Sequence, residues 1–520
     1  MEPQAAFERI STSKSDDSTR RNCQSLSYSI CPFVTETIMR STGILWARCR
    51  NSSGASWSML VALIVLFSPV TTRSQTVTTF RNNTLSSREI VPLENKTLAQ
   101  MLGLSPTYVE HPLPPEETEH ALGGAYRRAS NYLTKKGISI DFVYWSQFAA
   151  NITGGTAKHQ DYAHQIGMNS TFDLEKIMDV KNTKIFFAGA ERAGRNLGMD
   201  ALGNNSFRPT QIYGGGGNVL FHLVYFYLQK TWAHEKIRWI IGRYAVGADY
   251  DSTMLHCTFE ALAICSQPRA TTFVPAYASW PSTAWGTNVK VRPTPDTYIV
   301  PGIFASNPKR GGTAGTAWEN ASGVTLVNEL GWEPEFGEGR LSGHYKLGVL
   351  WDSSPYQYNN AANTLHLGNR HGLMMEWAAF DQMVWRHGSY QTAGLMLLGG
   401  YTHVTSAVTQ LSDQVYVGVV DFGIIRSRSY DGFGMEFSQG RYGKNFAAEV
   451  QPDPEHNIGY RGLWQRPVLA SKERIFELTY RIHAARGIYF SPEYQYIWRP
   501  GGGGYVKNAS VIGFDLRMFL

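Results

Sequence analysis

The sequence predicts an all-β fold: a transmembrane antiparallel β-barrel of about 16 strands with a short N-terminal periplasmic helix. Apolar and polar residues alternate along many segments, and the last of these segments runs to the final residue. In residues 507–520 the apolar face consists of Ile512, Phe514, Leu516, Met518 and Leu520. Soluble chains usually end in a few frayed polar residues, so we expect this terminal strand to be paired along its whole length.

The polar face of the C-terminal segments excludes a small packed sandwich. In residues 476–496 this face carries Glu477, Arg481, His483, Glu493 and Gln495. Inside a dry core each of these groups would need a buried partner, so we expect the face to meet water. An apolar face toward lipid and a polar face toward water are typical of outer-membrane barrel strands.

The composition agrees with a membrane protein, and the sequence argues against a nucleic-acid partner and against a cofactor that is bound through phosphate. Charged residues make up 17% of the chain and aromatic residues 13%, whereas average globular proteins contain about 25% charged residues. The formal net charge is +6, but no concentrated basic stripe suggests a nucleic-acid partner. The glycine-rich runs at 214–217 and 418–423 do not open a helix after a strand, so we expect no cofactor that is bound through phosphate.

Residues 1–74 are interpreted as a leader. The apolar run 59–70 is too short for the about 20 residues of a membrane helix, and it follows Arg40, Arg48 and Arg50. It therefore reads as the core of a signal peptide with cleavage near Ser74, and a signal anchor is the alternative.

Three regions surround or follow this leader core. The first 38 residues are polar and Ser-rich, and are interpreted as an over-extended start or a disordered tail. Residues 75–118 are expected to form a flexible periplasmic segment. A short helix is expected over 119–137, ended by Gly137.

The outer-membrane barrel is expected over residues 138–520. The alternating segments lie near 138–148, 161–175, 184–192, 219–231, 235–244, 283–292, 296–305, 323–333, 341–352, 371–386, 390–403, 414–426, 432–448, 476–483, 488–496 and 507–520. Short turns at 233–234, 293–295 and 387–389 suit the periplasmic rim. The longer connections 245–282 and 353–370 suit either the outer face or the lumen.

Cys257 and Cys265 are the only cysteine pair downstream of the leader, which holds Cys23, Cys31 and Cys49. The periplasm is oxidising, so a disulfide between Cys257 and Cys265 is the simplest prediction. A metal site is not expected, because only His256 lies nearby and further ligands are missing.

Several local sequences resemble one known family when taken in order. They are ALGGAYRRASNYLTKKGISIDFVY, NITGG, RAGRNL, IGRYAVGADYDSTMLHCTFEALAICSQP, WPSTAWGTNVKV and FELTYRIHAARGIYFSPEYQYIWRPGGG. Together they resemble the carbohydrate-selective porins of the OprB family, over roughly residues 121–520. The resemblance implies a Gram-negative outer-membrane barrel, surrounded by lipid, that admits glucose-like sugars by diffusion past an eyelet of inward loops. Two features depart from the family pattern: Leu520 follows Phe519 at the C-terminus, and residues 75–118 match nothing in it.

Strand parity gives candidates for contact with sugar in the lumen. A sugar needs hydrogen-bonding side chains and an aromatic surface for its ring. The inward candidates are Asp141, Trp145, Gln147, Gln165, Asn169, Asp173, Glu175, Asn288, Lys290 and Arg292. For Trp145, stacking on a sugar is one reading, and packing against an inward loop or in an interface girdle is the other.

Charged residues near two strand ends are candidates for the eyelet. They are Glu191, Arg192 and Arg195 in AERAGRN, and Arg243, Asp249 and Asp251 in GRYAVGADYD. Folded inward, guanidinium and carboxylate groups would bind hydroxyls and set ion preference. The alternative is that they are solvated loop charges or loop-to-wall ion pairs.

Two other functions compete with a porin. A soluble or surface carbohydrate-binding β-protein would also be aromatic and Gly-rich, but it would not have a lipid face on every strand. An outer-membrane enzyme would need a nucleophile, a histidine and an acid on one strand face. Neither His344 nor His483 has such a set of residues on its own strand face. A monomer and a homotrimer are both compatible with the pattern.

Overall fold

The structure, a computed structural model, describes residues 125–212, 221–306, 321–337, 341–359, 369–387, 393–453 and 464–520. All of them belong to the compact unit Ser86–Leu520. The predicted leader (1–74) and periplasmic segment (75–118) lie outside the described residues.

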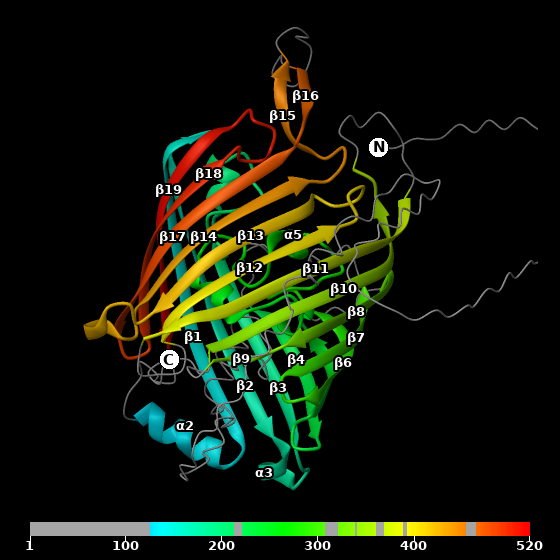
Figure 1. The fold of residues 1–520 in the computed structure, drawn as a ribbon, viewed down its shortest axis with the longest axis vertical. Helices are drawn as coiled ribbons and strands as arrows, with labels where there is room; N and C mark the ends of the chain where they lie inside the picture. Colours follow the sequence, from blue (N-terminus) through cyan, green and yellow to red (C-terminus); the bar gives the residue numbers. More distant parts are fainter. Residues whose placement is uncertain are drawn as a thin grey trace, which may run out of the picture. The chain divides into compact units, whose positions relative to one another are not determined.

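The alternating segments form a closed antiparallel barrel of 16 strands in the described part of the chain, as predicted (Figure 1). The last strand pairs with the first, with Phe514 opposite Phe148, and this pairing closes the sheet. In order around the barrel the strands are β1 Ile138–Gly155, β2 His159–Asp173, β3 Thr183–Gly194, β4 His222–Trp232, β5 Ile237–Tyr244, β6 Ala284–Thr294, β7 Thr297–Ser306, β8 Gly323–Trp332, β10 Leu341–Gln357, β11 Asn369–Arg386, β12 Gly394–Val404, β13 Leu411–Phe422, β14 Gly432–Tyr442, β17 Lys472–Ala485, β18 Ile488–Trp498 and β19 Lys507–Phe519.

Smaller elements lie at the two ends of the barrel and inside it. Short β9 (Glu335–Phe336) pairs with β10, and β15 (Ala447–Asp453) pairs with β16 (Trp464–Leu469). The helices are α2 Ala125–Lys135, α3 Leu174–Met178, α4 Leu197–Ala201, α5 Arg269–Thr272, η2 Val246–Ala248, η3 Met254–Thr258 and η4 Arg426–Arg428. Among the described residues no helix is long and apolar enough to cross a membrane.

The helix expected over 119–137 is present as α2, which begins at Ala125. The hydroxyl of Tyr126 donates a hydrogen bond to the carbonyl of Ile140 at 3.0 Å, so the helix is fastened to the start of β1. Gly137 follows with φ +89°, a conformation that favours glycine. Short turns such as 233–236 and 486–487 lie at the same end as α2 and α3 (Figure 1), and short turns mark the periplasmic end.

The two faces of the wall have the predicted sidedness. Outward-facing apolar side chains are exposed, among them Leu326 at 45%, Leu347 at 57% and Val417 at 55%. The terminal strand follows the same rule, and the N–H of Leu520 still donates to the carbonyl of Phe142 at 2.8 Å. A soluble β-protein would bury such residues, so this exposed apolar surface indicates contact with lipid.

The connection between β5 and β6 folds into the barrel. In residues 245–283, named here the inward loop, Ser282 is the only exposed residue, and all of this range is described. Its short helix α5 packs against β12 and β13 and lies behind them in Figure 1. The sequence allowed this connection to lie either at the outer face or in the lumen. In the structure it lies in the lumen.

Carboxylates on the inner wall hold the inward loop. Glu477 on β17 accepts hydrogen bonds from the backbone N–H groups of Glu260 at 2.6 Å and Ala261 at 2.9 Å. Glu329 on β8 accepts one from the N–H of Asp251 at 2.8 Å. A backbone N–H buried away from water needs such a partner. These residues therefore meet loop backbone, and the expectation that the whole polar face meets water was wrong for this part of the wall.

A second loop is held in the same way. Residues 195–212 belong to the β3–β4 connection and are named here the second loop. Glu473, on β17, accepts hydrogen bonds from the N–H groups of Ser206 at 3.0 Å and Phe207 at 2.7 Å. Gln147 accepts one from the N–H of Ile212 at 2.6 Å. Both loops are thus fixed to the wall through their backbone.

We predict that Val417→Arg destabilises the barrel by about 2–4 kcal/mol, because Val417 is outward-facing near the middle of β13 and an arginine there would sit in hydrocarbon. Urea unfolding in lipid vesicles measures this free energy, with Val417→Leu as the apolar control. Equal stability of the two variants would show that this face does not meet lipid.

Replacing Glu477 with alanine should loosen the inward loop. The N–H groups of Glu260 and Ala261 would lose their acceptor, and an unsatisfied buried group costs about 1–3 kcal/mol. Single-channel recordings should then show a larger and noisier conductance than in the unmodified protein. Glu477→Gln keeps one oxygen acceptor and should change the current less. Recordings of Glu477→Ala that match the unmodified protein would contradict the anchoring role.

Candidate functional site

A cavity of about 180 Å³ lies where the inward loop meets β3 and the second loop. This volume holds on the order of ten water molecules, which suits a small solute. Its lining residues are Arg192, Gln211, Leu262, Cys265, Ser266, Arg269, Thr272, Val274, Pro275, Tyr277, Ala278, Ser279, Trp280, Pro281 and Ser282. Among the described residues, this lining contains two arginines and no carboxylate.

One glutamine on the wall orients two of these side chains. The side-chain oxygen of Gln165, on β2, accepts a hydrogen bond from Nε of Arg192 at 2.6 Å. The same oxygen accepts a hydrogen bond from the indole nitrogen of Trp280 at 2.8 Å. A guanidinium from the wall and an indole from the inward loop are therefore held beside each other at one edge of the cavity.

Arg269 supplies a second guanidinium from the inward loop. Its Nε donates to the carbonyl of Ser206 at 3.2 Å and its Nη1 to the hydroxyl of Thr272 at 3.1 Å. The guanidinium carbon lies 3.8 Å from the centre of the Phe273 ring. These contacts fix the position of the guanidinium at the edge of the cavity.

Trp280 belongs to an aromatic group beside the cavity. Its ring meets that of Tyr225 edge-on, with centroids 5.3 Å apart. Tyr277, another lining residue, donates its hydroxyl to the carbonyl of Tyr250. Hydrogen-bond donors beside an aromatic surface can bind the hydroxyls and the C–H faces of a sugar ring.

Buried titratable groups of the inward loop add little charge to this site. Burial lowers the pKa of His256 to about 4, so the imidazole is neutral at pH 7. Burial also raises the pKa values of the Asp251 and Glu260 carboxyls well above their ordinary range. Among the described residues that line the cavity, the charged side chains are those of Arg192 and Arg269.

Of the predicted eyelet residues, Arg192 lines the cavity. Glu191, its neighbour, faces outward because adjacent strand residues point to opposite sides, and it pairs with His164 at 3.3 Å. Arg195 has a side chain that is 69% exposed and pairs with Asp200 at 2.9 Å. The inward placement expected for Glu191 and the eyelet position expected for Arg195 are therefore corrected.

The other three predicted eyelet residues do not line the cavity either. Asp249 pairs with Arg238 at 2.7 Å, and Asp251 accepts a hydrogen bond from Thr271 at 2.5 Å. Arg243 is buried and lies opposite Phe226 in the β4–β5 register. Asp249 and Asp251 do fold inward, but their carboxylates fasten the loop to the wall and to itself.

The predicted sugar-contact residues of the wall are engaged elsewhere. Trp145 donates its indole N–H to Asp515 and is covered by the guanidinium of Arg517 at 4.4 Å, both on the neighbouring strand β19. Lys290 lies 3.9 Å from the centre of the Tyr298 ring, and Arg292 pairs with Glu333 at 2.7 Å. Gln147 binds the second loop as described above, and Asp141 is buried.

Sequence reasoning missed Arg269 and Trp280. Both lie in a loop without periodicity, so no alternation could indicate which way their side chains point. The signal that was available is the motif WPSTAWG, which places an indole shortly before β6. Gln165, which the parity of β2 did predict as inward, proves to be the residue that orients Trp280.

Three potential metal ligands also meet at the extracellular mouth. One ligand atom each of His159, Asp161 and Asp200 lies within 4.8 Å of the others. Arg195 already brings a positive charge there, at 2.9 Å from Asp200 and 3.7 Å from Asp161. Hydrogen bonding from Arg195 lowers the pKa of Asp200.

Comparison with known proteins identifies the family. Residues 157–518 match the model of the carbohydrate-selective porin, OprB family. Porin B of Pseudomonas aeruginosa is 27% identical over 408 residues, covering 74% of this chain and 88% of that protein. The putative porin QuiX of Acinetobacter baylyi is 25% identical over 410 residues, covering 74% and 90%.

A solved structure shares the fold. The high pH structure of Pseudomonas putida OprB has a TM-score of 0.69 and 23% identity, covering 76% of this chain and 97% of that chain. These relatives are porins, which are channels. The chain therefore belongs to the OprB family of carbohydrate-selective porins, and it is an outer-membrane β-barrel through which carbohydrates diffuse.

Proposed function

We propose that the cavity beside Arg192, Arg269 and Trp280 is the narrow part of the sugar path, and that glucose-like monosaccharides pass it singly. The observation that supports this most directly is the shared acceptor on Gln165, which holds Arg192 and Trp280 together. Guanidinium N–H groups would donate to sugar hydroxyls, while the indole would pack against C–H groups of the ring.

The same lining favours anions over cations among the ions that enter. Among the described lining residues there are two arginines and no carboxylate, and cationic groups along a narrow aqueous path attract anions. A neutral sugar is unaffected by this attraction. Sugar contact and ion preference would thus arise from the same side chains.

We also propose that the chain acts only as a channel and not as an enzyme. His344 pairs with Asp381 at 2.6 Å, which is one part of a catalytic arrangement. However, Asp381 also accepts a hydrogen bond from Thr253 of the inward loop at 2.9 Å, so the pair contributes to loop anchoring. Neither side chain lines the cavity.

The buried thiols of Cys257 and Cys265 are proposed to form a disulfide in the exported protein. They are free in the structure, with their sulfur atoms 2.8 Å apart. Burial acts to raise the pKa of Cys257, but the Cys265 thiol and Arg517 outweigh it and lower the pKa to about 7. A thiolate available at neutral pH favours oxidation.

Trp280→Ala should weaken the block of single-channel current by glucose about three- to tenfold, which corresponds to roughly 0.7–1.4 kcal/mol of lost aromatic contact. Planar-bilayer recordings over a glucose series measure this block. Trp351→Ala is the matched control, because Trp351 is 46% exposed on the lipid face. If glucose block is unchanged in Trp280→Ala, the indole does not belong to the sugar path. If Arg269→Ala keeps the ion selectivity of the unmodified protein, Arg269 does not set the ion preference.

For the disulfide, thiol alkylation of denatured protein from isolated outer membranes should label neither Cys257 nor Cys265 unless a reductant is added. A Cys257→Ser, Cys265→Ser variant should unfold with about 2–3 kcal/mol less stability than the oxidised protein. Full alkylation without reductant would show that the thiols stay reduced.

A further inference from the structure

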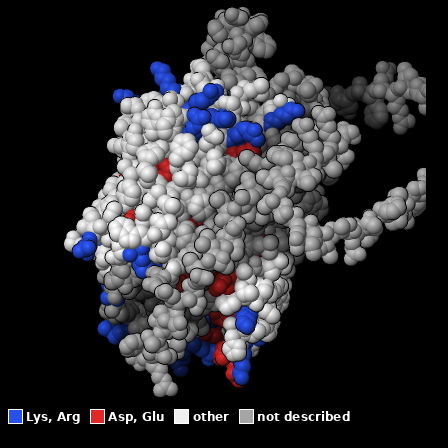
Figure 2. Space-filling model, viewed as in Figure 1, with Lys and Arg blue, Asp and Glu red and all other residues white. Residues whose placement is uncertain are grey.

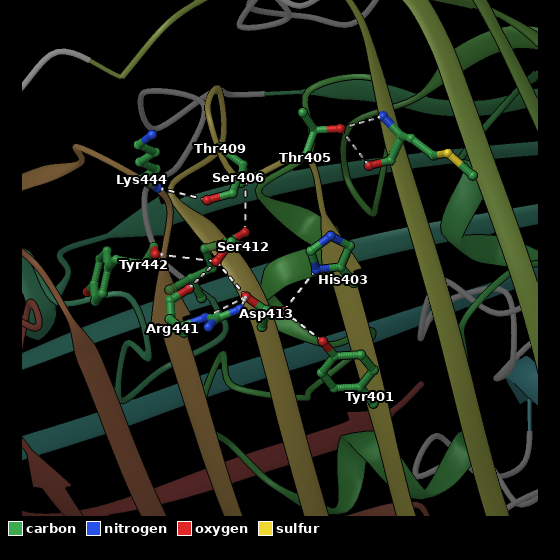
Figure 3. Close-up of polar contacts among 12 residues, drawn as sticks. Tyr401, His403, Thr405, Ser406, Thr409, Ser412, Asp413, Arg441, Tyr442 and Lys444 are labelled. Carbon is green, nitrogen blue, oxygen red and sulfur yellow. Dashed lines mark hydrogen bonds and ion pairs between the residues drawn. The ribbon is translucent and has the colours of Figure 1, made fainter. Parts of the chain in front are cut away.

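A group of polar side chains lies on the outer surface of the barrel at the extracellular ends of β12, β13, β14 and β17. Figure 3 draws those of β12, β13 and β14. In the strand register His403 is opposite Asp413, Asp413 is opposite Arg441, and Arg441 is opposite Lys472. Arg474, two residues beyond Lys472, is opposite Gln439. We name Arg441, Lys472 and Arg474 the outer basic patch.

The outer basic patch faces the same way as the lipid-exposed residues. Met435 and Phe437 precede Arg441 at alternate positions of β14 and are 39% and 37% exposed. The side chain of Arg441 is itself 60% exposed. Residues at alternate positions of a strand share one face, so Arg441 continues the outward row and does not enter the channel.

The height of the patch matches the lipid headgroups. Aromatic side chains lie on the same outward face, including Tyr401, which is 43% exposed, and Trp498, whose ring is 6.1 Å from that of Phe437. Aromatic girdles mark the membrane interface on such barrels. Figure 2 shows Lys and Arg side chains gathered over the upper ends of the strands that face the viewer. The extracellular end of an outer-membrane barrel meets the outer leaflet, so these cations lie where its headgroups lie.

Local contacts fix the orientation of the two guanidinium groups. Asp413 accepts hydrogen bonds from Nε of Arg441 at 2.8 Å and from its Nη2 at 2.6 Å. It also accepts from His403 at 2.8 Å and from Tyr401 at 2.7 Å (Figure 3). The Nε of Arg474 donates to Gln439 at 2.7 Å. Arginines held in this way lose less entropy when they bind an anion, and their remaining N–H groups match the geometry of phosphate oxygens.

Two carboxylates limit the extent of the patch. Asp413 neutralises part of the charge of Arg441, and Glu376 is the register partner of His403 on the side away from the patch. Arg441, Lys472 and Arg474 lie together on the other side of Asp413. An anion is therefore attracted to the β14–β17 side.

We propose that Arg441, Lys472 and Arg474 bind the phosphate groups of the outer-leaflet glycolipid, lipopolysaccharide. The three cations would replace the divalent ions that otherwise neutralise neighbouring lipid phosphates, and they would fix the height and orientation of the barrel in the membrane. This role is independent of the sugar path, because the patch is on the outside of the wall.

The test compares full-length protein with an Arg441→Gln, Lys472→Gln, Arg474→Gln variant. Binding of purified lipopolysaccharide in detergent micelles is measured by titration, and the variant is expected to bind at least tenfold more weakly. A Lys176→Gln, Lys181→Gln, Lys236→Gln variant removes three exposed charges at the periplasmic turns and should bind like the unmodified protein. Equal affinity of the patch variant and the unmodified protein, or equal weakening in both variants, would overturn the proposal.

Two further arms separate the possible ligands without relying on a variant. Unmodified protein should bind enzymatically dephosphorylated lipopolysaccharide at least tenfold more weakly than the intact glycolipid, and equal binding would overturn the assignment to phosphate. Millimolar inorganic phosphate should not displace the glycolipid, and displacement would indicate a site for free phosphate rather than for lipid.

Glucose block in the patch variant should equal that of the unmodified protein, so failure of the lipid-binding proposal and failure of the proposed sugar path are distinguishable.

Discussion

The channel depends on hydrogen bonds from loop backbone to carboxylates on the inner wall. A strand satisfies its backbone groups through its neighbours, but a loop that enters the barrel has no such neighbours and must find other partners. Glu473 and Glu477 provide them from a single strand, β17, where they lie four residues apart on the inward face. Glu473 holds the second loop and Glu477 holds the inward loop. One strand therefore contacts both segments that narrow the barrel, and residues of other strands add further contacts.

This arrangement explains how a wide barrel becomes a narrow path. Barrels of 16 strands leave an aqueous lumen, and here the inward loop occupies much of it. The remaining cavity lies at the junction of the two loops with β3, and its lining comes from all three. Gln165 completes the junction, since it joins a wall arginine to a loop tryptophan. The site is formed where the two loops meet the wall, and no single strand supplies it.

The sequence predicted the strands well and the site only in part. Alternation indicated each strand of the barrel and its lipid face, because one side must be apolar and the other polar along every strand. The same parity predicted inward positions for Gln165 and Trp145. Glu191 follows the strand rule and points outward beside Arg192. Trp145 was inward as expected, but Arg517 covers it, and contacts between distant strands cannot be deduced from one strand alone.

The loop residues were beyond prediction for a physical reason. A loop has no repeating geometry, so the sequence of residues 245–283 does not say which side chains meet the wall and which meet the cavity. Arg269 and Trp280 line the cavity because wall residues such as Glu477, Glu329 and Gln414 fix the loop in one position. The partners in these contacts lie more than 70 residues apart in the chain.

Amide hydrogen exchange of the full-length protein in lipid nanodiscs tests this account most directly. If the inward loop is fastened to the wall through its backbone, the N–H groups of Glu260 and Ala261 should exchange as slowly as those of the central barrel strands. Exchange at the rate of freely solvated amides would show that the loop is not held, and the cavity that depends on it would then have no fixed lining.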